Sequence, residues 1–316
     1  MILRFLLCLC VFESAFAQSK VEQAQKLYES RKYPEAISLL SAVKKDDKEF
    51  AGAQYWLGRV AYDQKRLDDA EEFFEEAVDA DEKAPEYHNW LANAYAEIAQ
   101  NANVFKQGLL APKMKAQWEK AVELSPDYLE PRKSLIQFYL QAPGFMGGSI
   151  DKAKETAKQI MKINVAEGHL QMGNIYVKQK NIQEAEKEFL EMVKADPAYI
   201  SGLAGFYIGQ KQYDKAFVIF DDALKKDPQD MRSTYLFGRT SAVSGLRLER
   251  GEECLRKYLT YTPKSNEPSL GGANMRLAQI MEKKGNKAEA KKLYETALKL
   301  DANLKEATEG LQRTSK

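Results

Sequence analysis

The stretch Met172–Pro197, MGNIYVKQKNIQEAEKEFLEMVKADP, carries the pattern that decides how the chain is organised. Within it, Gly173 is followed three positions later by Tyr176, and Ala185 is followed four positions later by Phe189. Apolar residues spaced by three and four favour amphipathic helices, and small residues recur where two helices approach closely. The pattern therefore predicts helices that pack tightly against each other.

The same positions recur along most of the chain. Ala36 and Ala70 occupy the same position in successive copies of the pattern, and Leu57-Gly58 repeats the large-small pair that Met172-Gly173 forms. Larger side chains at the small positions would overpack a contact between helices. We count eight units, near residues 18–48, 51–84, 85–128, 129–165, 166–197, 197–230, 231–263 and 268–302, followed by an amphipathic segment at 304–313.

This combination resembles the tetratricopeptide repeat (TPR), a 34-residue unit with a large-small pair, Tyr, Ala, Phe and Pro at fixed offsets. The resemblance implies that each unit is a pair of antiparallel helices, which buries its apolar faces only by stacking on its neighbours. We therefore predict an all-α fold, a right-handed α-solenoid of about eight TPR-like helix pairs over residues 18–316. Residues 304–313 would form a C-terminal capping helix, and the stack would enclose a concave groove.

Two insertions interrupt the third and fourth units. Residues Gln100–Lys113 are expected to separate the two helices of the third unit. Residues Ala142–Ser149 contain a proline and three glycines, which cannot continue a helix, so we expect a structured loop with Ser149 as the N-cap of the next helix. Loops that grow on one face of a repeat array often carry function.

Residues 1–17 are expected to be an export signal. Arg4 precedes the apolar run Phe5–Phe12, and Ala15–Ala17 supplies a small-x-small cleavage pattern. Because the run is far shorter than the roughly 20 residues of a spanning helix, we predict cleavage after Ala17, a periplasmic or secreted location, and no integral membrane segment after cleavage. A retained anchor and lipid attachment are the alternatives. The signal and the stretch Gln137–Ser149 also resemble exported bacterial TPR proteins.

The overall charge argues against nucleic acid as a partner. The chain has 47 lysine and arginine residues against 46 aspartate and glutamate residues, a net charge of +1. Proteins that bind nucleic acid normally carry a basic surplus that neutralises phosphates. Signal cleavage would leave Cys254 as the last of three cysteines, so no intramolecular disulfide is expected.

No set of residues points to catalysis, a metal or a cofactor. His88 and His169 fall at the same helix position in different repeats, which predicts a packing role for both and no shared site. Cys254 has no neighbouring base in the sequence and is expected to be a small buried residue. Gly144–Ser149 lacks the Gly-Lys-Ser/Thr of a phosphate-binding loop. We therefore predict that the chain is not an enzyme.

The TPR resemblance places particular positions of each first helix on the concave side. Tyrosine, arginine and asparagine at these positions are typical of protein-binding surfaces. The expected partner-binding residues are Tyr55, Arg59, Tyr62, Asn89, Asn93, Lys133, Gln137, Asn174, Tyr235 and Arg239. The Lys-Asn clamp with which one variant of this fold grips a peptide carboxylate is not reproduced.

The sequence thus favours a non-catalytic protein–protein interaction scaffold of the bacterial cell envelope, which holds a polypeptide segment in its concave groove. Two alternatives stay open. One is a small-molecule binder or enzyme that uses the loops at 100–113 and 142–149. The other is a self-associating structural protein, for example a homodimer.

Overall fold

A computed structural model describes residues 19–315 of the chain. The expected signal segment, residues 1–17, lies outside the described residues. The chain divides into two compact units, one that ends at Ile163 and one that begins at Asn164.

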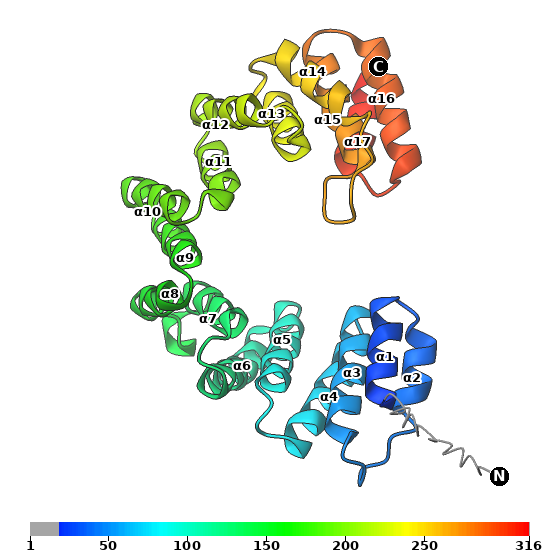
Figure 1. Cartoon of the computed structure of the whole chain (residues 1–316), viewed down its shortest axis with the longest axis vertical. Helices are drawn as coiled ribbons and strands as arrows, with labels where there is room; N and C mark the ends of the chain where they lie inside the picture. Colours follow the sequence, from blue (N-terminus) through cyan, green and yellow to red (C-terminus); the bar gives the residue numbers. More distant parts are fainter. Residues whose placement is uncertain (1–18, 316) are drawn as a thin grey trace, which may run out of the picture. The chain divides into compact units, whose positions relative to one another are not determined.

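The described part of the first unit, residues 19–163, contains eight α-helices and one short 3₁₀ helix, coloured blue to green in Figure 1. They are α1 (Lys20–Glu29), α2 (Tyr33–Leu40), α3 (Phe50–Asp63), α4 (Leu67–Ala80), α5 (Pro85–Gln100), α6 (Val104–Leu124), α7 (Leu129–Gln141), η1 (Gly144–Met146) and α8 (Ile150–Ile163).

The second unit continues the same plan. Its elements are α9 (Val165–Lys178), α10 (Ile182–Ala195), η2 (Pro197–Tyr199), α11 (Ile200–Gly209), α12 (Tyr213–Lys226), α13 (Met231–Ser244), α14 (Leu248–Tyr258), α15 (Leu270–Lys283), α16 (Lys287–Leu300) and α17 (Lys305–Thr314).

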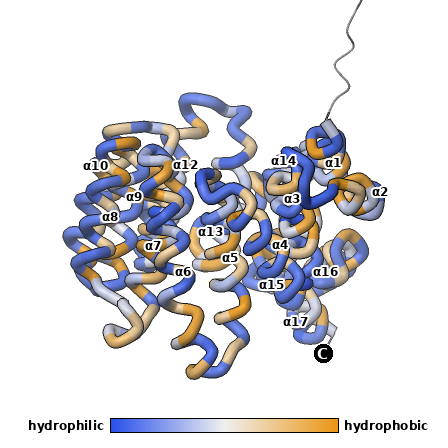
Figure 2. The backbone as a smooth tube through the Cα atoms, turned by 90° about the horizontal axis from the view of Figure 1, so that it is seen from below, coloured by the Kyte–Doolittle hydropathy of each residue, from blue (hydrophilic) through white to orange (hydrophobic). Residues whose placement is uncertain are grey.

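Consecutive helices pack against each other as pairs, from α1 with α2 to α15 with α16. Between residues 19 and 315 this gives eight pairs and no strand, and α17 packs on both helices of the last pair. The predicted all-α fold of successive helix pairs is therefore confirmed. Figure 2 shows that hydrophobic and hydrophilic residues alternate along the helices, as expected when one side of each helix is buried.

Small residues allow the two helices of a pair to approach closely. Ala36 and Ala70, at equivalent positions of the first two pairs, both have no exposed surface. A Cβ atom added to Gly58 on α3 would lie 2.6 Å from the ring of Phe74 on α4, closer than real contacts allow. Position 58 is therefore a glycine because an aromatic ring of the second helix occupies the space of a side chain there.

Five of the eight turns inside the pairs described between residues 19 and 315 share one backbone conformation. Arg31, Lys65, Lys180 and Lys211 each have a positive φ, between 56° and 62°, just after the first helix of a pair. Gly285 occupies the corresponding turn with a φ of 82°. In each turn the next residue donates its backbone N–H to a carbonyl five residues back, such as Lys32 to Leu27 at 2.8 Å. This is the hydrogen bond that closes a helix at a left-handed residue.

The structure corrects the interpretation of Gln100–Lys113 as an insertion loop. Helix α5 extends to Gln100 and α6 begins at Val104, so only residues 101–103 are outside a helix. The side chain of Asn103 accepts a hydrogen bond from the backbone N–H of Lys106 at 2.9 Å and caps α6. The extra residues therefore lengthen a helix to 21 residues, against 14 for α4 and α8.

The expected loop at 142–149 is present and ordered by its own backbone. Gly147 has a φ of 101°, and the N–H of Gly148 donates to the carbonyl of Pro143 at 3.1 Å. The Ser149 N–H donates to the carbonyl of Tyr139 at 2.9 Å. The Ser149 hydroxyl accepts from the N–H of Lys152 at 3.3 Å, so its predicted N-cap role is confirmed.

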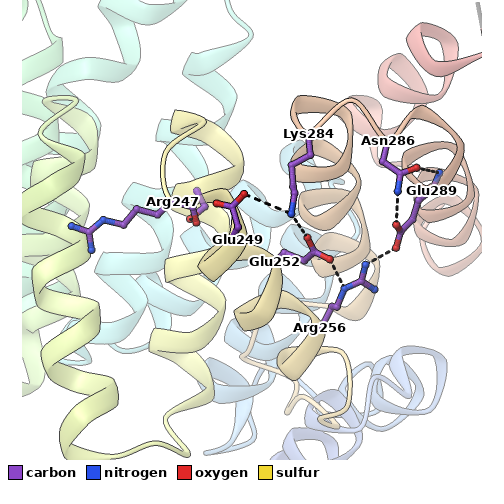
Figure 3. Close-up of polar contacts among 8 residues, drawn as sticks. Arg247, Glu249, Glu252, Arg256, Lys284, Asn286 and Glu289 are labelled. Atoms are coloured by element: carbon purple, nitrogen blue, oxygen red, sulfur yellow. Dashed lines mark hydrogen bonds and ion pairs between the residues drawn. The ribbon is translucent and has the colours of Figure 1, made fainter.

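Ion pairs join neighbouring helices of the second unit (Figure 3). Arg256 on α14 contacts Glu252 on the same helix at 2.8 Å and Glu289 on α16 at 2.5 Å. Lys284, at the end of α15, contacts Glu252 at 2.8 Å. Partial burial acts to raise the pKa of Glu252, but the hydrogen bonds from Lys284 and Arg256 together outweigh it and hold that pKa below its usual value. Because the Arg256 side chain is about half exposed, we regard this network as a modest contribution to stability.

Within residues 19–315, every helix is too short or too polar to cross a membrane.

Candidate functional site

Helices α5, α6 and α7 follow one another in the first unit (Figure 1). A groove of about 540 Å³ is lined mainly by residues of these three helices. Four of the residues predicted to bind a partner line it: Tyr62 from α3, Asn93 from α5, and Lys133 and Gln137 from α7. The sequence separates Tyr62 from Gln137 by 75 positions, so the folding of three helix pairs brings these side chains together.

The floor of the groove is apolar. Met114, Trp118, Phe138 and Met146 all line it. The Trp118 and Phe138 rings lie 6.3 Å apart, and the indole N–H of Trp118 donates to Asn93 Oδ1 at 3.1 Å. That hydrogen bond satisfies the one polar atom of the indole. Met114, Trp118 and Phe138 are only 8%, 5% and 8% exposed, so the surface that the floor presents to a ligand is apolar and small, and half-buried Met146 adds its thioether.

Charged side chains stand at the edges of the groove, each with a partner. Lys133 Nζ lies 2.7 Å from Glu130 Oε1, and Glu97 Oε1 lies 2.9 Å from Nζ of Lys65, which does not itself line the groove. The Tyr62 hydroxyl donates to Glu97 at 3.5 Å. Burial raises the pKa of Tyr62, and the Glu97 carboxylate raises it further. Tyr62 therefore remains a neutral donor, and the groove combines an apolar floor with a mixed-charge edge.

Both insertions contribute to the groove, although one of them is helical. Gln107, Ala111, Met114 and Trp118 repeat at helical spacing on one face of α6. The Gln107 amide donates to the carbonyls of Ala99 and Ala102 at 3.1 and 3.0 Å, which ties α6 to the end of α5. Pro143 and Met146 of the loop at 142–149 also line the groove.

The sequence prediction missed the apolar floor. Asn103 could have indicated this helix. Asparagine is a preferred N-cap and predicts a helix that starts at the next residue, and residues at helical spacing follow it. A helix over 104–124 would have put Met114 and Trp118 on the same face as Gln107.

Arg59 and Tyr55 are engaged within the chain. The Arg59 guanidinium lies 3.8 Å from the centroid of the Trp90 ring, and it donates to the hydroxyls of Tyr55 at 2.9 Å and Tyr28 at 3.0 Å. The Tyr55 ring also stacks on Tyr87 at 5.0 Å. Stacking and hydrogen bonds of this kind join three successive helix pairs, so Arg59 has a structural role in the first unit.

The remaining predicted residues differ in their exposure. Asn89 and Tyr235 are only 3% and 8% exposed, so their side chains offer little surface to a partner. Asn174 and Arg239 are exposed, and Asn174 borders a shallow hollow of about 300 Å³ between α9 and α11. Partner binding by the predicted set as a whole stays a prediction.

The histidines and the cysteine have packing roles. His88 is buried and its ring nitrogens contact Gln117 Oε1 at 2.5 Å and the Glu82 carbonyl at 2.9 Å. His169 pairs with Glu188 at 2.6 Å in the other unit. Cys254 is buried, and burial raises the pKa of its thiol to about 11. Among the described residues, no three His, Cys, Asp or Glu side chains are grouped so that they could hold a metal ion.

Comparison with solved structures finds the same architecture. A tetratricopeptide repeat protein from Parabacteroides merdae ATCC 43184 aligns with a TM-score of 0.52 at 14% identity, over 94% of this chain and 98% of that one. The C-terminal part of a TPR protein from Cytophaga hutchinsonii aligns with a TM-score of 0.47 at 15% identity, over 92% and 99%. A thermophilic TPR protein from Thermus thermophilus gives 0.45 at 17% identity, over 59% and 95%. At these identities, the first likeness supports the fold alone.

Comparison with protein families agrees with the structure. Residues 21–85 match the family described as tetratricopeptide repeat, and residues 166–199 and 272–304 match a second family of the same description. Proteins of this kind generally act as scaffolds that bind other proteins. The repeat spacing, the helix pairs and these matches show that the chain belongs to the tetratricopeptide repeat superfamily.

Proposed function

We propose that this TPR protein binds a polypeptide segment in the groove of its first unit and acts as a non-catalytic scaffold in the bacterial cell envelope. One observation carries the groove proposal. Tyr62, Asn93, Lys133 and Gln137, predicted as partner-binding residues from the sequence, line one groove with an apolar floor. The envelope location rests on the N-terminal sequence alone.

The groove chemistry suits a segment with an apolar anchor between polar neighbours. Half-buried Met146 and the exposed edges of Met114, Trp118 and Phe138 would contact a leucine, methionine or aromatic side chain, since buried anchors of this kind dominate binding energy. Gln137 and Gln141 are exposed on α7, and amides of this kind can hydrogen bond to a peptide backbone at the edge.

The test uses a photoreactive amino acid at one position of the groove. We would replace Gln137 by benzoylphenylalanine and compare it with the same replacement at Gln183, an exposed helical glutamine of the second unit. In cells, the Gln137 protein should crosslink a specific protein that the Gln183 protein does not. The same crosslinked species from both positions, or none from Gln137, would contradict the proposal.

A blocking variant provides a second readout. Ser134→Trp adds a large side chain to the groove edge, and Ser134 is only partly buried, so the fold should tolerate it. Crosslinking from Gln137 should fall at least tenfold in this variant. Retention of full crosslinking would show that the partner lies outside the groove.

A small-molecule ligand is the second candidate, because the groove volume falls within the range of roughly 300–1,000 Å³ typical of ligand pockets. Native mass spectrometry of the purified protein would separate the two proposals. A bound small molecule that disappears in Ser134→Trp would favour this alternative, whereas an empty groove that captures a peptide favours the scaffold.

A further inference from the structure

The three most exposed large apolar side chains among residues 19–315 all lie near the start of α6 and in the loop before α8. Phe145 is 84% exposed, Phe105 is 77% exposed and Val104 is 68% exposed. Leu109, one turn along α6 from Phe105, is 56% exposed. We call Val104, Phe105, Leu109 and Phe145 the apolar rim.

Contacts between α6 and η1 bring the two parts of the rim together. A Cβ atom added to Gly108 on α6 would lie 3.6 Å from the terminal methyl carbon of Met146 in η1. Phe105 precedes Gly108 by three positions, so it lies one turn away on the same side of the helix. Phe145 is the residue before Met146. The rim is therefore one patch built from two segments.

The rim is separate from the groove. Gln107, Ala111 and Met114 of α6 line the groove, whereas Phe105 and Leu109 lie about half a turn away around the same helix. None of the four rim residues lines the groove. Helix α6 thus has apolar residues on two faces. One face packs against the folded chain, and the face with Phe105 and Leu109 is left uncovered.

The size of the patch exceeds what scattered surface residues produce. Phenylalanine side chains bury roughly 150–250 Å² each, so the two exposed rings alone present on the order of 300 Å². With Val104 and Leu109 the patch reaches the upper range for a soluble monomer, where such patches are often binding surfaces.

Charge around the rim indicates what covers it. Residues 98–163 contain ten lysines and arginines against six acidic residues, a net of +4, although the whole chain has a net of +1. Neither 98–118 nor 131–150 contains an aspartate or glutamate. Lys106 is exposed beside Phe105, and Lys113 lies about two turns further along α6. Both lysines interact electrostatically with the Glu71 carboxylate of α4.

We propose that the apolar rim inserts into the surface of an anionic lipid bilayer, with Lys106 near the headgroups. Exposed aromatic and aliphatic side chains beside lysines are the combination that holds proteins at a lipid interface. A second copy of the chain fits less well, because a two-fold contact through the rim would bring the exposed Lys106 side chains of the two copies close to each other. A peptide fits less well because these side chains project into solvent and do not line a cavity.

The test measures co-sedimentation of the full chain with vesicles. One set contains phosphatidylcholine and phosphatidylglycerol at three to one, and the other contains phosphatidylcholine alone. Phe105→Ser with Phe145→Ser removes the two rings of the rim. The matched control, Leu190→Ser with Val218→Ser, removes two side chains that are 47% and 54% exposed in the second unit. All versions keep the same N-terminal segment, so differences between them report on the substituted residues.

The wild type and the control should sediment with the anionic vesicles, and the rim variant should lose at least tenfold in partition coefficient. Lys106→Gln should reduce partition several-fold on anionic vesicles and leave the neutral vesicles unaffected, since each lysine near an anionic surface contributes to attraction. Equal sedimentation of rim variant and control would overturn the proposal. So would a wild type that does not sediment, or light scattering that shows a dimer abolished by the rim variant.

Discussion

Replacement of Gly148 by alanine tests how the groove is held in shape. An ideal Cβ atom at Gly148 would lie 1.8 Å from the carbonyl oxygen of Ala142 and 2.7 Å from its carbonyl carbon. Both are backbone atoms, so no flexible side chain can move aside, and the segment from Ala142 to Gly148 must shift by more than 1 Å to reach the closest contact that real structures show.

The shift should cost the hydrogen bonds that close the loop. These are the bonds from the Gly148 N–H to Pro143 at 3.1 Å and from the Ser149 N–H to Tyr139 at 2.9 Å, together with the Ser149 cap of α8. With about 0.5–1.5 kcal/mol for each bond and about 1 kcal/mol for the cap, Gly148→Ala should lower the free energy of unfolding by about 2–4 kcal/mol.

The chain provides both a reporter and a control. All three tryptophans, Trp56, Trp90 and Trp118, lie in the first unit, so denaturant unfolding followed by tryptophan fluorescence reports on that unit. Gly144→Ala is the control, because a Cβ there meets no atom within 4 Å, and its effect should stay within about 0.5 kcal/mol of zero. If Gly148→Ala unfolds at the same denaturant concentration as Gly144→Ala, the described loop geometry is wrong.

Three further predictions follow from single contacts. Arg59→Lys keeps the charge but loses the stacking on Trp90 and the hydrogen bonds to two tyrosine hydroxyls. Denaturant titration should show a free energy of unfolding that is lower by about 1–3 kcal/mol. An unchanged midpoint would contradict the structural role of Arg59. Lys211 has a positive φ of 57°, which glycine adopts without strain. After allowance for the flexibility of glycine in the unfolded chain, Lys211→Gly should raise the free energy of unfolding in denaturant titration by about 0.5–1 kcal/mol. A loss of stability would show that the turn has another conformation. The hydrogen bond from Arg313 holds the pKa of Glu282 below its unfolded value of about 4.3, so its contribution is complete above that pH and is lost as the pH falls through the lower folded value. Glu282→Gln should therefore lower the thermal midpoint more at pH 7 than at pH 3, and an equal effect at both would refute the assigned ion pair.

The helix pairs could be predicted from the sequence because their spacing follows directly from packing. Ala36, Ala70 and Ala185 have no exposed surface, since each must fit against a neighbouring helix. Such positions tolerate few residue types, and their regular recurrence is visible without any structure. Four residues of the groove could be identified for the same reason, because the repeat fixes which side of each first helix they occupy.

The α6 helix could not be predicted in the same way. Gly108 and Pro112 weaken any helical interpretation of 104–113, because proline lacks the N–H that would bond to the carbonyl of Gly108. In the structure, Leu110, Ala111 and Met114 pack against the chain and the helix continues past the proline. Tertiary packing therefore overrides a local preference that the sequence alone suggests.

The roles of individual residues predicted to bind a partner depended on contacts with distant parts of the chain. Arginine is a residue type expected on a binding surface, yet Tyr28 from the first helix pair and Trp90 from the third contact the Arg59 side chain. Asn89 is likewise covered, and its amide donates to the Tyr128 hydroxyl at 3.2 Å. Position within a repeat predicts the direction of a side chain, but neighbouring repeats decide whether that side chain remains accessible.

The central claim is that the groove of the first unit holds a polypeptide segment by its apolar floor. The most direct measurement is isothermal titration of the segment crosslinked at Gln137, made as a synthetic peptide, against wild-type protein and Ser134→Trp. The account predicts saturable binding to the wild type and at least a tenfold weaker affinity for Ser134→Trp. A third protein, Gln183→Arg, changes an exposed residue of the second unit and should bind as the wild type does. Equal affinity for all three proteins would contradict it.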